Sequence, residues 1–264
     1  MNILERIVEV KKMEVEKAKS LVTASDLEKT PHFSSPVIST VGRLKDETLT
    51  GIITEFKKAS PSKGIINDQV TVEEVVTGYA ENGAVAISVL TDEQFFKGSL
   101  ADLEAARAAV KNVPLLRKDF VIDEYQLLQA KASGADLILL IAACLSPEKV
   151  QSLASFAKSL QLEVLLELHA EDELDHICDE VDIVGVNNRD LKTFKVNIEQ
   201  SIRLASKIPA GKCRISESGI YSMDTIETLK EGGFEGFLIG ENFMREKDPV
   251  AAFKNFLKSG SYES

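Results

Sequence analysis

The sequence lacks several features that define common protein classes. Its 264 residues include three cysteines, Cys144, Cys178 and Cys213, and this odd, widely spaced set excludes a disulfide scaffold and indicates reduced thiols. The longest uncharged apolar run, Leu137–Leu145, has nine residues, whereas a membrane span needs about 18. Acidic residues outnumber basic ones by 42 to 31, which argues against a large nucleic-acid surface. Any anionic ligand must therefore be held by a few placed cations.

Motifs for common cofactors are missing as well. The chain has no G-x-G-x-x-G fingerprint, P-loop, C-x-x-C pair or H-E-x-x-H helix, and its three histidines make no helical metal pair. We therefore expect no cofactor and no metal. Charged residues interrupt the apolar ones in Met1–Lys12, unlike a signal peptide. We expect a cytoplasmic monomer that acts on a small-molecule substrate and contacts neither nucleic acid nor membrane.

Three segments follow from the hydrophobic pattern. In residues 1–48, Ile3, Leu4 and Ile7 recur at helical spacing among Lys and Glu residues, which predicts an amphipathic helical extension. In residues 49–258, short apolar runs alternate with helical patterns, and residues 259–264 are expected to be a short C-terminal tail. At 264 residues, a single domain of barrel size fits the length.

Eight short runs rich in Ile, Val and Leu are predicted to be strands: Gly51–Lys57, Ala84–Leu90, Pro114–Asp119, Asp136–Ala142, Leu162–Leu168, Ile183–Asn187, Cys213–Ser216 and Phe237–Gly240. The helical patterns between them include Val72–Asn82, Leu100–Lys111, Glu124–Ser133, Pro147–Leu160 and Met223–Glu231. Continuously apolar strands that alternate with helices imply a parallel sheet covered on both faces. Polar residues follow predicted strands throughout the series of eight, which fits a barrel because its strand ends all meet at one mouth. In an open sheet, only a few strand ends meet at the crevice. The sequence predicts an α/β fold, a single (β/α)8 barrel with an N-terminal helical extension.

Candidate catalytic residues lie at the ends of these strands. Glu55 and Lys57 are two residues apart on one strand and share a face, either as part of the barrel mouth or as a strand-end ion pair, while Lys58 points the other way and is expected to be solvated. Lys118 can be a proton donor, a Schiff-base nucleophile or a charge clamp. Alternatively, Asp119 neutralises Lys118 in a structural role, although Arg117 competes for it.

Further polar groups follow the later strands. Apolar neighbours predict a raised pKa for Glu167, which suits acid–base work, but a buried structural acid is the alternative. Asn187 and Arg189 offer hydrogen bonds and an anion fork, or else an Asx turn with a surface salt bridge. Ser60 begins a loop that can close over a ligand, and Phe96 can stack on a ring or plug the rim.

The two last strand ends are candidates for phosphate binding. Ser218 and Gly219 follow Glu217, and Gly240 and Glu241 follow the last apolar run; each turn precedes a predicted helix. Loops at these positions of a barrel commonly present backbone N–H groups to a phosphate.

These residues occur in segments that resemble indole-3-glycerol phosphate synthase. The resemblance covers Glu55–Gly64, Leu90–Asp92, Phe96–Ser99, Leu116–Phe120, Leu165–Glu167, Gly185–Leu191, Ser216–Ile220 and Leu238–Gly240. Their order and spacing agree from residue 51 to about 245, and the N-terminal extension is also similar to that of the family. The resemblance implies a barrel enzyme of tryptophan biosynthesis without a cofactor. Its substrate would be 1-(2-carboxyphenylamino)-1-deoxyribulose 5-phosphate, which undergoes ring closure, decarboxylation and dehydration.

The resemblance also implies roles for the residues. Lys118 would be the general acid at the ketose oxygen, Glu167 would serve acid–base steps, and Lys57 would neutralise an anionic substrate group and help proton transfer. The remaining implied roles are orientation by Glu55, Asn187 and Glu217, substrate contact by Ser60 and Arg189, and a phosphate frame of Ser218, Gly219, Gly240 and Glu241. The chain has no tryptophan, so the wall for the anthranilate ring must come from Phe96, Phe120 or aliphatic residues. Glu241 is expected to contribute only its backbone N–H.

Two other functions are compatible with the residues alone. A Schiff-base lyase or aldolase on the same barrel would use Lys118 as its nucleophile. A phosphate-binding barrel without activity would bind ligand and not turn it over, although the complete set of lysine, glutamate and asparagine argues against it.

Overall fold

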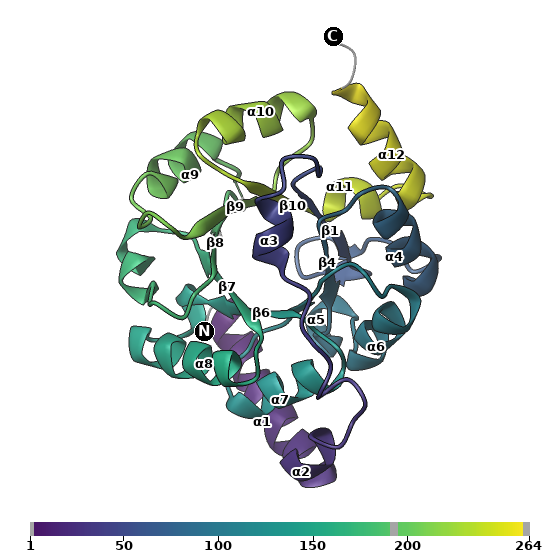
Figure 1. Cartoon of the computed structure of the whole chain (residues 1–264), viewed down its shortest axis with the longest axis vertical. Helices are drawn as coiled ribbons and strands as arrows, with labels where there is room; N and C mark the ends of the chain where they lie inside the picture. The colour runs from purple at the N-terminus through teal and green to yellow at the C-terminus, as the bar shows by residue number, and fades with distance from the viewer. Residues whose placement is uncertain (1–2, 191–194, 261–264) are drawn as a thin grey trace.

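The computed structural model describes residues 3–190 and 195–260. Eight parallel strands close into a barrel, in which each strand pairs with its neighbours in the chain and β1 pairs with β10 (Figure 1). The strands are β1 (Ile52–Phe56), β4 (Ala86–Leu90), β5 (Leu115–Lys118), β6 (Leu137–Ile141), β7 (Glu163–Leu168), β8 (Ile183–Asn187), β9 (Cys213–Glu217) and β10 (Gly236–Ile239). The predicted (β/α)8 barrel is confirmed.

Helices surround the barrel, as Figure 1 shows. They are α4 (Val72–Glu81), α6 (Leu100–Ala109), α7 (Glu124–Ala132), α8 (Pro147–Ser159), α9 (Ile198–Ala205), α10 (Met223–Glu231) and α12 (Pro249–Ser259). The predicted boundaries differ from these by no more than two residues where both were given, because capping residues mark the ends: Thr71 and Asp123 form capping boxes, and Ser146 caps α8 ahead of Pro147. Ser259 belongs to α12, and residues 261–264 of the expected tail lie outside the described residues.

Shorter elements occupy the connections. The expected loop at Ser60–Gly64 is the turn of a small hairpin, in which β2 (Ala59–Ser60) pairs with β3 (Gly64–Ile65). The others are α5 (Glu93–Phe96), α11 (Glu241–Met244), and the short 3₁₀ helices η1 (Ala142–Cys144) and η2 (Glu171–His176). In the described part of the chain, no helix is long and apolar enough to cross a bilayer.

The N-terminal extension reaches both ends of the barrel. It contains α1 (Ile3–Leu21), α2 (Ala24–Leu27) and α3 (Thr40–Leu44). At the amino ends of the strands, Thr40 donates its N–H to Glu163 at the start of β7, and Arg43 donates to the carbonyl of Val85 just before β4. Figure 1 shows α3 across this opening of the barrel. At the other end, Ile3, Leu4 and Ile7 of α1 lie over the carboxyl ends of the strands.

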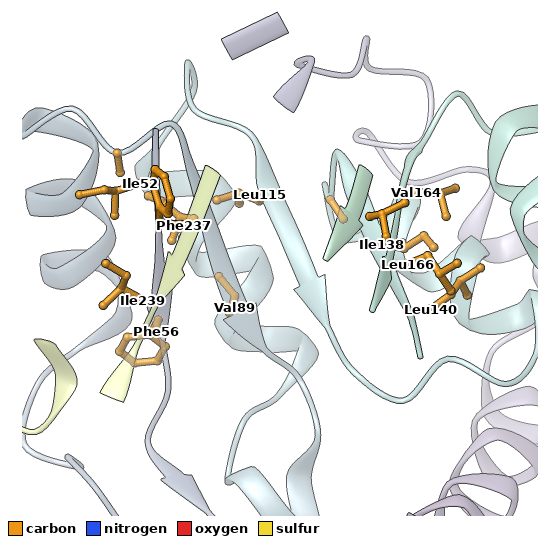
Figure 2. Packing of buried hydrophobic residues seen from close by; sticks show 14 of the residues in the cluster. Ile52, Phe56, Val89, Leu115, Ile138, Leu140, Val164, Leu166, Phe237 and Ile239 are labelled. Carbon is orange, nitrogen blue, oxygen red and sulfur yellow. The ribbon is translucent and has the colours of Figure 1, made fainter. Parts of the chain in front are cut away.

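Buried apolar side chains form two layers. Outward-facing residues pack between strands and helices, including Ile52, Phe56, Val89, Leu115, Ile138, Leu140, Val164, Leu166, Phe237 and Ile239 (Figure 2). Inward-facing residues fill the barrel, including Ile53, Leu116, Leu139, Leu165, Ile183, Ile215 and Leu238. Side chains two apart on a strand share a face. A residue two positions beyond an inward-facing core residue therefore points into the barrel mouth.

Candidate active site

A cavity of about 230 Å³ opens at the carboxyl ends of the barrel strands. All the residues singled out from the sequence as site residues line it: Glu55, Lys57, Ser60, Phe96, Lys118, Phe120, Glu167, Asn187, Arg189, Glu217, Ser218, Gly219, Gly240 and Glu241. Several of them stand two residues after an inward-facing core residue; Lys118, for example, follows Leu116 in this way. The strand periodicity thus places them together.

Lys118 lies between two carboxylates from neighbouring parts of the mouth. Its Nζ donates to Oε2 of Glu167 on β7 at 3.0 Å and to Oε2 of Glu217 on β9 at 2.6 Å. Asp119 does not neutralise it, since that carboxylate pairs with Arg117 and with Lys11 of α1. The structural alternative for Lys118 is therefore wrong, and its partners are the other candidate acids.

The pKa values of Glu217 and Glu167 are shifted in opposite directions. Burial raises the pKa of Glu217 to about 7, and the charges of Glu167 and Glu55 add to this against the opposing effect of Lys118. Burial also favours a raised pKa for Glu167, but Lys118, His169 and Asn187 together hold it well below the usual value. The raised pKa expected for Glu167 is thus wrong. Leu166 and Leu168, the residues on either side of it, face the other side of the strand, and the groups that lower its pKa include side chains from other strands.

The lysine itself stays protonated. Burial alone would lower the pKa of Lys118, but the charges of Glu167, Glu217 and Glu55 outweigh that effect and raise it above the ordinary value. The ammonium form, which is a proton donor and not a nucleophile, therefore dominates at neutral pH.

A second pair stands on β1 and just beyond it. Nζ of Lys57 donates to Oε1 of Glu55 at 2.6 Å, and Glu55 also accepts from Ser88 on β4. The ion pair and the position in the mouth, considered as alternatives from the sequence, occur together. Lys58 is not simply solvated, since it forms an ion pair with Asp102 at 2.8 Å.

Asn187 and Arg189 connect the site at the end of β8 with residues that follow the last strand. The Nδ2 group of Asn187 donates to Oε1 of Glu167 at 3.1 Å, while its Oδ1 accepts from the backbone N–H of Arg189. The Asx turn is therefore present and also orients a side chain of the cavity. Arg189 pairs with Glu241 at 3.2 Å, and Leu191, which ends this motif, lies outside the described residues.

The carboxylate of Glu241 forms ion pairs with two basic side chains. Its carboxylate lies 3.2 Å from Nη2 of Arg189 and 3.8 Å from Nζ of Lys63 on the β2–β3 hairpin. Its side chain neutralises two cations on one side of the cavity, and contact of its backbone N–H with a phosphate stays a prediction. The sequence could not show the ion pairs, because both partners come from other strand connections.

Two glycines next to these groups are required for different reasons. A Cβ at Gly240 would lie 2.3 Å from Oε1 of Glu55, so this position must stay bare for the Glu55 side chain to fit. Gly219 has a positive φ of 70°, and a Cβ there would meet Val196. Ser218 adopts the same positive φ, which turns two successive residues toward the cavity rim.

The apolar wall of the cavity combines barrel and extension. The rings of Phe96 and Phe120 lie 6.2 Å apart between centroids, and both line the cavity. Leu90, Leu139 and Ile141 add aliphatic surface below them. From α1 come Ile3, Leu4 and Ile7. Phe96 is thus a wall residue of the cavity.

Two residues were missed from the sequence: His169 in the mouth, and Lys11 on α1, which pairs with Asp119 of the cavity lining. His169 lies just beyond β7, with Nε2 3.1 Å from Oε1 of Glu167. Its signal was the two-residue spacing from Glu167, which puts both side chains on one face. Lys11 is buried with Ile7 and Val15 on the same stripe of α1. The sequence signal for this burial was a single charged residue on the apolar face of the helix. No group of three or more His, Cys, Asp or Glu side chains in residues 3–190 and 195–260 is arranged to hold a metal ion.

Solved structures with similar folds support the architecture. A 3-hexulose-6-phosphate synthase from Salmonella typhimurium aligns with a TM-score of 0.62 and 12% identity over 79% of this chain and 97% of that one. The tryptophan synthase subunit alpha of Legionella pneumophila aligns with a TM-score of 0.62 and 15% identity, over 83% and 94%. At such low identity these matches speak for the fold alone. Fold and site together define a (β/α)8-barrel enzyme whose ionisable side chains surround one mouth.

Sequence comparisons narrow this class to one family. A family model described as indole-3-glycerol phosphate synthase matches residues 4–256. The indole-3-glycerol phosphate synthase of Bacteroides thetaiotaomicron is 46% identical over 258 residues, covering 98% of each chain. That of Prochlorococcus marinus subsp. pastoris is 43% identical and covers 98% of this chain and 90% of its own. The chain belongs to the indole-3-glycerol phosphate synthase family.

Proposed function

We propose that the protein is the carboxy-lyase of tryptophan biosynthesis that makes indole-3-glycerol phosphate. Its substrate is 1-(2-carboxyphenylamino)-1-deoxyribulose 5-phosphate, and the products are indole-3-glycerol phosphate, carbon dioxide and water. The observation that carries the chemistry is the lysine ammonium of Lys118 between Glu167 and Glu217. This arrangement offers one proton donor with two adjacent groups that can exchange protons with it.

We place the substrate across the mouth. Its aromatic ring lies against Phe96 and Phe120, and its carboxylate meets the ammonium of Lys57 beside Ser60. Its phosphate lies by the turns at Ser218–Gly219 and Gly240–Glu241, with Arg189 as the cation. Three cations support this placement, because Lys57, Lys118 and Arg189 line the cavity and could exchange their present carboxylate partners for the anionic groups of the substrate.

The first step forms a carbon–carbon bond. The ring carbon that bears the carboxylate attacks the ketose carbonyl carbon, and Lys118 donates a proton to the carbonyl oxygen, which becomes a hydroxyl. Loss of carbon dioxide returns the bonding electrons to the ring and restores aromaticity. No electron sink from a cofactor is needed for this decarboxylation.

The second step removes water. The new hydroxyl leaves with a proton, while a proton is lost from the neighbouring carbon, and the indole double bond forms. We assign Glu167 to this acid–base work, since its carboxylate is fixed by Lys118, Asn187 and His169. Glu55 and Glu217 orient the two lysines. A Schiff-base mechanism is disfavoured because the raised pKa of Lys118 keeps its amine protonated.

The remaining proposals concern the whole protein. We propose that residues 1–48 form an extension whose first helix covers the mouth, that residues 49–258 form the catalytic barrel, and that residues 259–264 are a tail. We also propose that it works in the cytoplasm as a monomer, without nucleic acid. The test of function is direct: purified protein is mixed with the anthranilate-linked ribulose phosphate, and indole formation is followed by absorbance or fluorescence. Ligand binding without turnover would contradict the proposal.

A further inference from the structure

His169 stands beside the acid–base carboxylate and has no part in the steps above. It follows Glu167 by two residues, so both side chains face the mouth. Nε2 lies 3.1 Å from Oε1 of Glu167, and 9% of the His169 side chain is exposed. Neither ring nitrogen makes a well-aligned hydrogen bond with the residues that the structure describes. The contact with Glu167 is therefore one of charge more than of hydrogen-bond geometry.

The mouth has more carboxylates than lysine ammonium groups, so a third cation would balance its charge. Three carboxylates face two lysine ammonium groups there: Glu55, Glu167 and Glu217 against Lys57 and Lys118. When Glu217 ionises, which its pKa of about 7 places near neutral pH, one negative charge is in excess among these buried groups, where an unbalanced charge is costly. A protonated His169 at 3.1 Å from one of these carboxylates would neutralise that excess.

The groups around the imidazole favour its charged form. On its far side, Nδ1 lies 4.0 Å from Oε2 of Glu173 in η2, and that carboxylate is fixed by the backbone N–H groups of His169 and Ala170. Glu217 on β9 adds a further negative charge, while Asn187 on β8 is neutral. Cys144 in η1 has a raised pKa, chiefly from burial, and stays a neutral thiol.

The ionisation of His169 follows from this environment. Burial would lower its pKa, but the close contact with the charged Glu167 and the charges of Glu173 and Glu217 outweigh burial and raise it above 6.5. The imidazolium is therefore favoured into the neutral range, where it faces an ionised Glu167.

We propose that His169 is a positioning residue of the active site: its imidazolium keeps Glu167 ionised for proton transfer by balancing the third carboxylate of the mouth. The inference rests on the proposed acid–base role of Glu167. It predicts that His169 and Glu167 titrate as partners and that the acid limb of the kcat profile depends on a side chain that need not touch the substrate.

The first experiment measures the partnership without catalysis. The chain has three histidines, so NMR titration of the imidazole rings yields few signals, and His169→Gln identifies the one in question. The His169 ring should titrate above its ordinary pKa in the parent protein and shift downward in Glu167→Gln. The control is Glu227→Gln, an exposed carboxylate on α10, which should leave the titration unchanged. A His169 titration unmoved by Glu167→Gln would overturn the inference.

The second experiment measures the consequence for turnover. His169→Gln keeps a polar side chain without charge, so kcat at the optimum should stay within about tenfold and KM within about twofold. The acid limb of its kcat profile should move to higher pH by about half a unit or more, because Glu167 loses a neighbouring cation. His169→Leu should show the same shift. Loss of thermal stability with superimposable pH profiles would mean a structural histidine and would overturn the proposal.

Failure of the inference and failure of the proposed function give different results. If Glu167→Gln retains full activity, the acid–base role of Glu167 is wrong and the inference falls with it. If Glu167→Gln loses about a hundredfold in kcat, as expected for an acid–base group, but the His169 titration is unchanged, the inference alone falls.

Discussion

Nζ of Lys11 on α1 lies 2.9 Å from Oδ1 of Asp119, the residue that follows Lys118 in the chain. The same ammonium lies 2.9 Å from Oδ2 of Asp92, which caps α5 ahead of Phe96. Burial would raise the pKa of Asp119, but Arg117 and Lys11 lower it to about 2, so it stays ionised. One buried lysine therefore anchors the helix over the mouth to two strand ends of the active site.

Replacing this lysine should weaken both the fold and substrate binding. Lys11→Met leaves Asp92 and Asp119 without their shared cation, and breaking a buried pair costs about 3–5 kcal/mol. KM should rise as well, because Ile3, Leu4 and Ile7 of the same helix line the cavity. Urea unfolding and steady-state kinetics measure the two effects. The matched control is Lys12→Met, an exposed neighbour whose loss should change neither by much. Equal behaviour of the two variants would remove Lys11 as the anchor.

The two lysines of the mouth should respond differently to arginine. Lys118→Arg keeps the charge but loses a transferable proton, so kcat should fall by about 10²–10⁴-fold, the contribution of a positioned general acid. Lys57→Arg should retain more activity and show part of its loss in KM, as expected for a ground-state contact. Steady-state kinetics on both variants, with folding checked by circular dichroism, decide the point. If Lys118→Arg stays within about tenfold of the parent while Lys57→Arg is inactive, the two roles are reversed.

The carboxylate of Glu241 should compete with anionic ligands. In the structure it occupies Arg189 at 3.2 Å and lies near Lys63, the cations that we place beside the substrate phosphate. Glu241→Gln frees both charges, so KM and the inhibition constant of inorganic phosphate should fall several-fold with kcat little changed. Glu246→Gln, an exposed acid shortly after α11, serves as the control. Weaker phosphate inhibition in Glu241→Gln would show that this carboxylate organises the site instead of occupying it.

Glu217 should make stability depend on pH. Its folded-state pKa of about 7 lies above the ordinary value of 4.5, so the folded protein binds this proton more tightly than the unfolded chain. The resulting stabilisation is full below pH 4.5 and is lost as the pH rises through about 7. Glutamine does not titrate, so Glu217→Gln should gain stability relative to the parent over this range. Denaturant unfolding at several pH values measures the difference, with Glu227→Gln as a flat reference. A difference that falls with pH would contradict the assignment.

The sequence predicted the barrel and a set of side chains that line one cavity, because both follow from the strand period and from position along each strand. Apolar strands fixed the alternation of inward and outward faces, and residues such as Glu55 and Lys118 continued the inward positions beyond the core. The sequence did not predict which side chains pair across the barrel: Lys118 contacts Glu167 and Glu217, which are 49 and 99 residues away in the chain. The pKa of Glu167 was predicted in the wrong direction for the same reason.

The extension touches parts of the barrel that are made much later than itself. Thr40 of α3 requires Glu163 at the start of β7, and Lys11 of α1 requires Asp119 beyond β5. During synthesis these helices leave the ribosome first, and these two contacts cannot form until more than a hundred further residues have followed. The contact of α3 with β7 can therefore form only after β7 has been made, which makes closure of the amino end of the barrel a late event in folding.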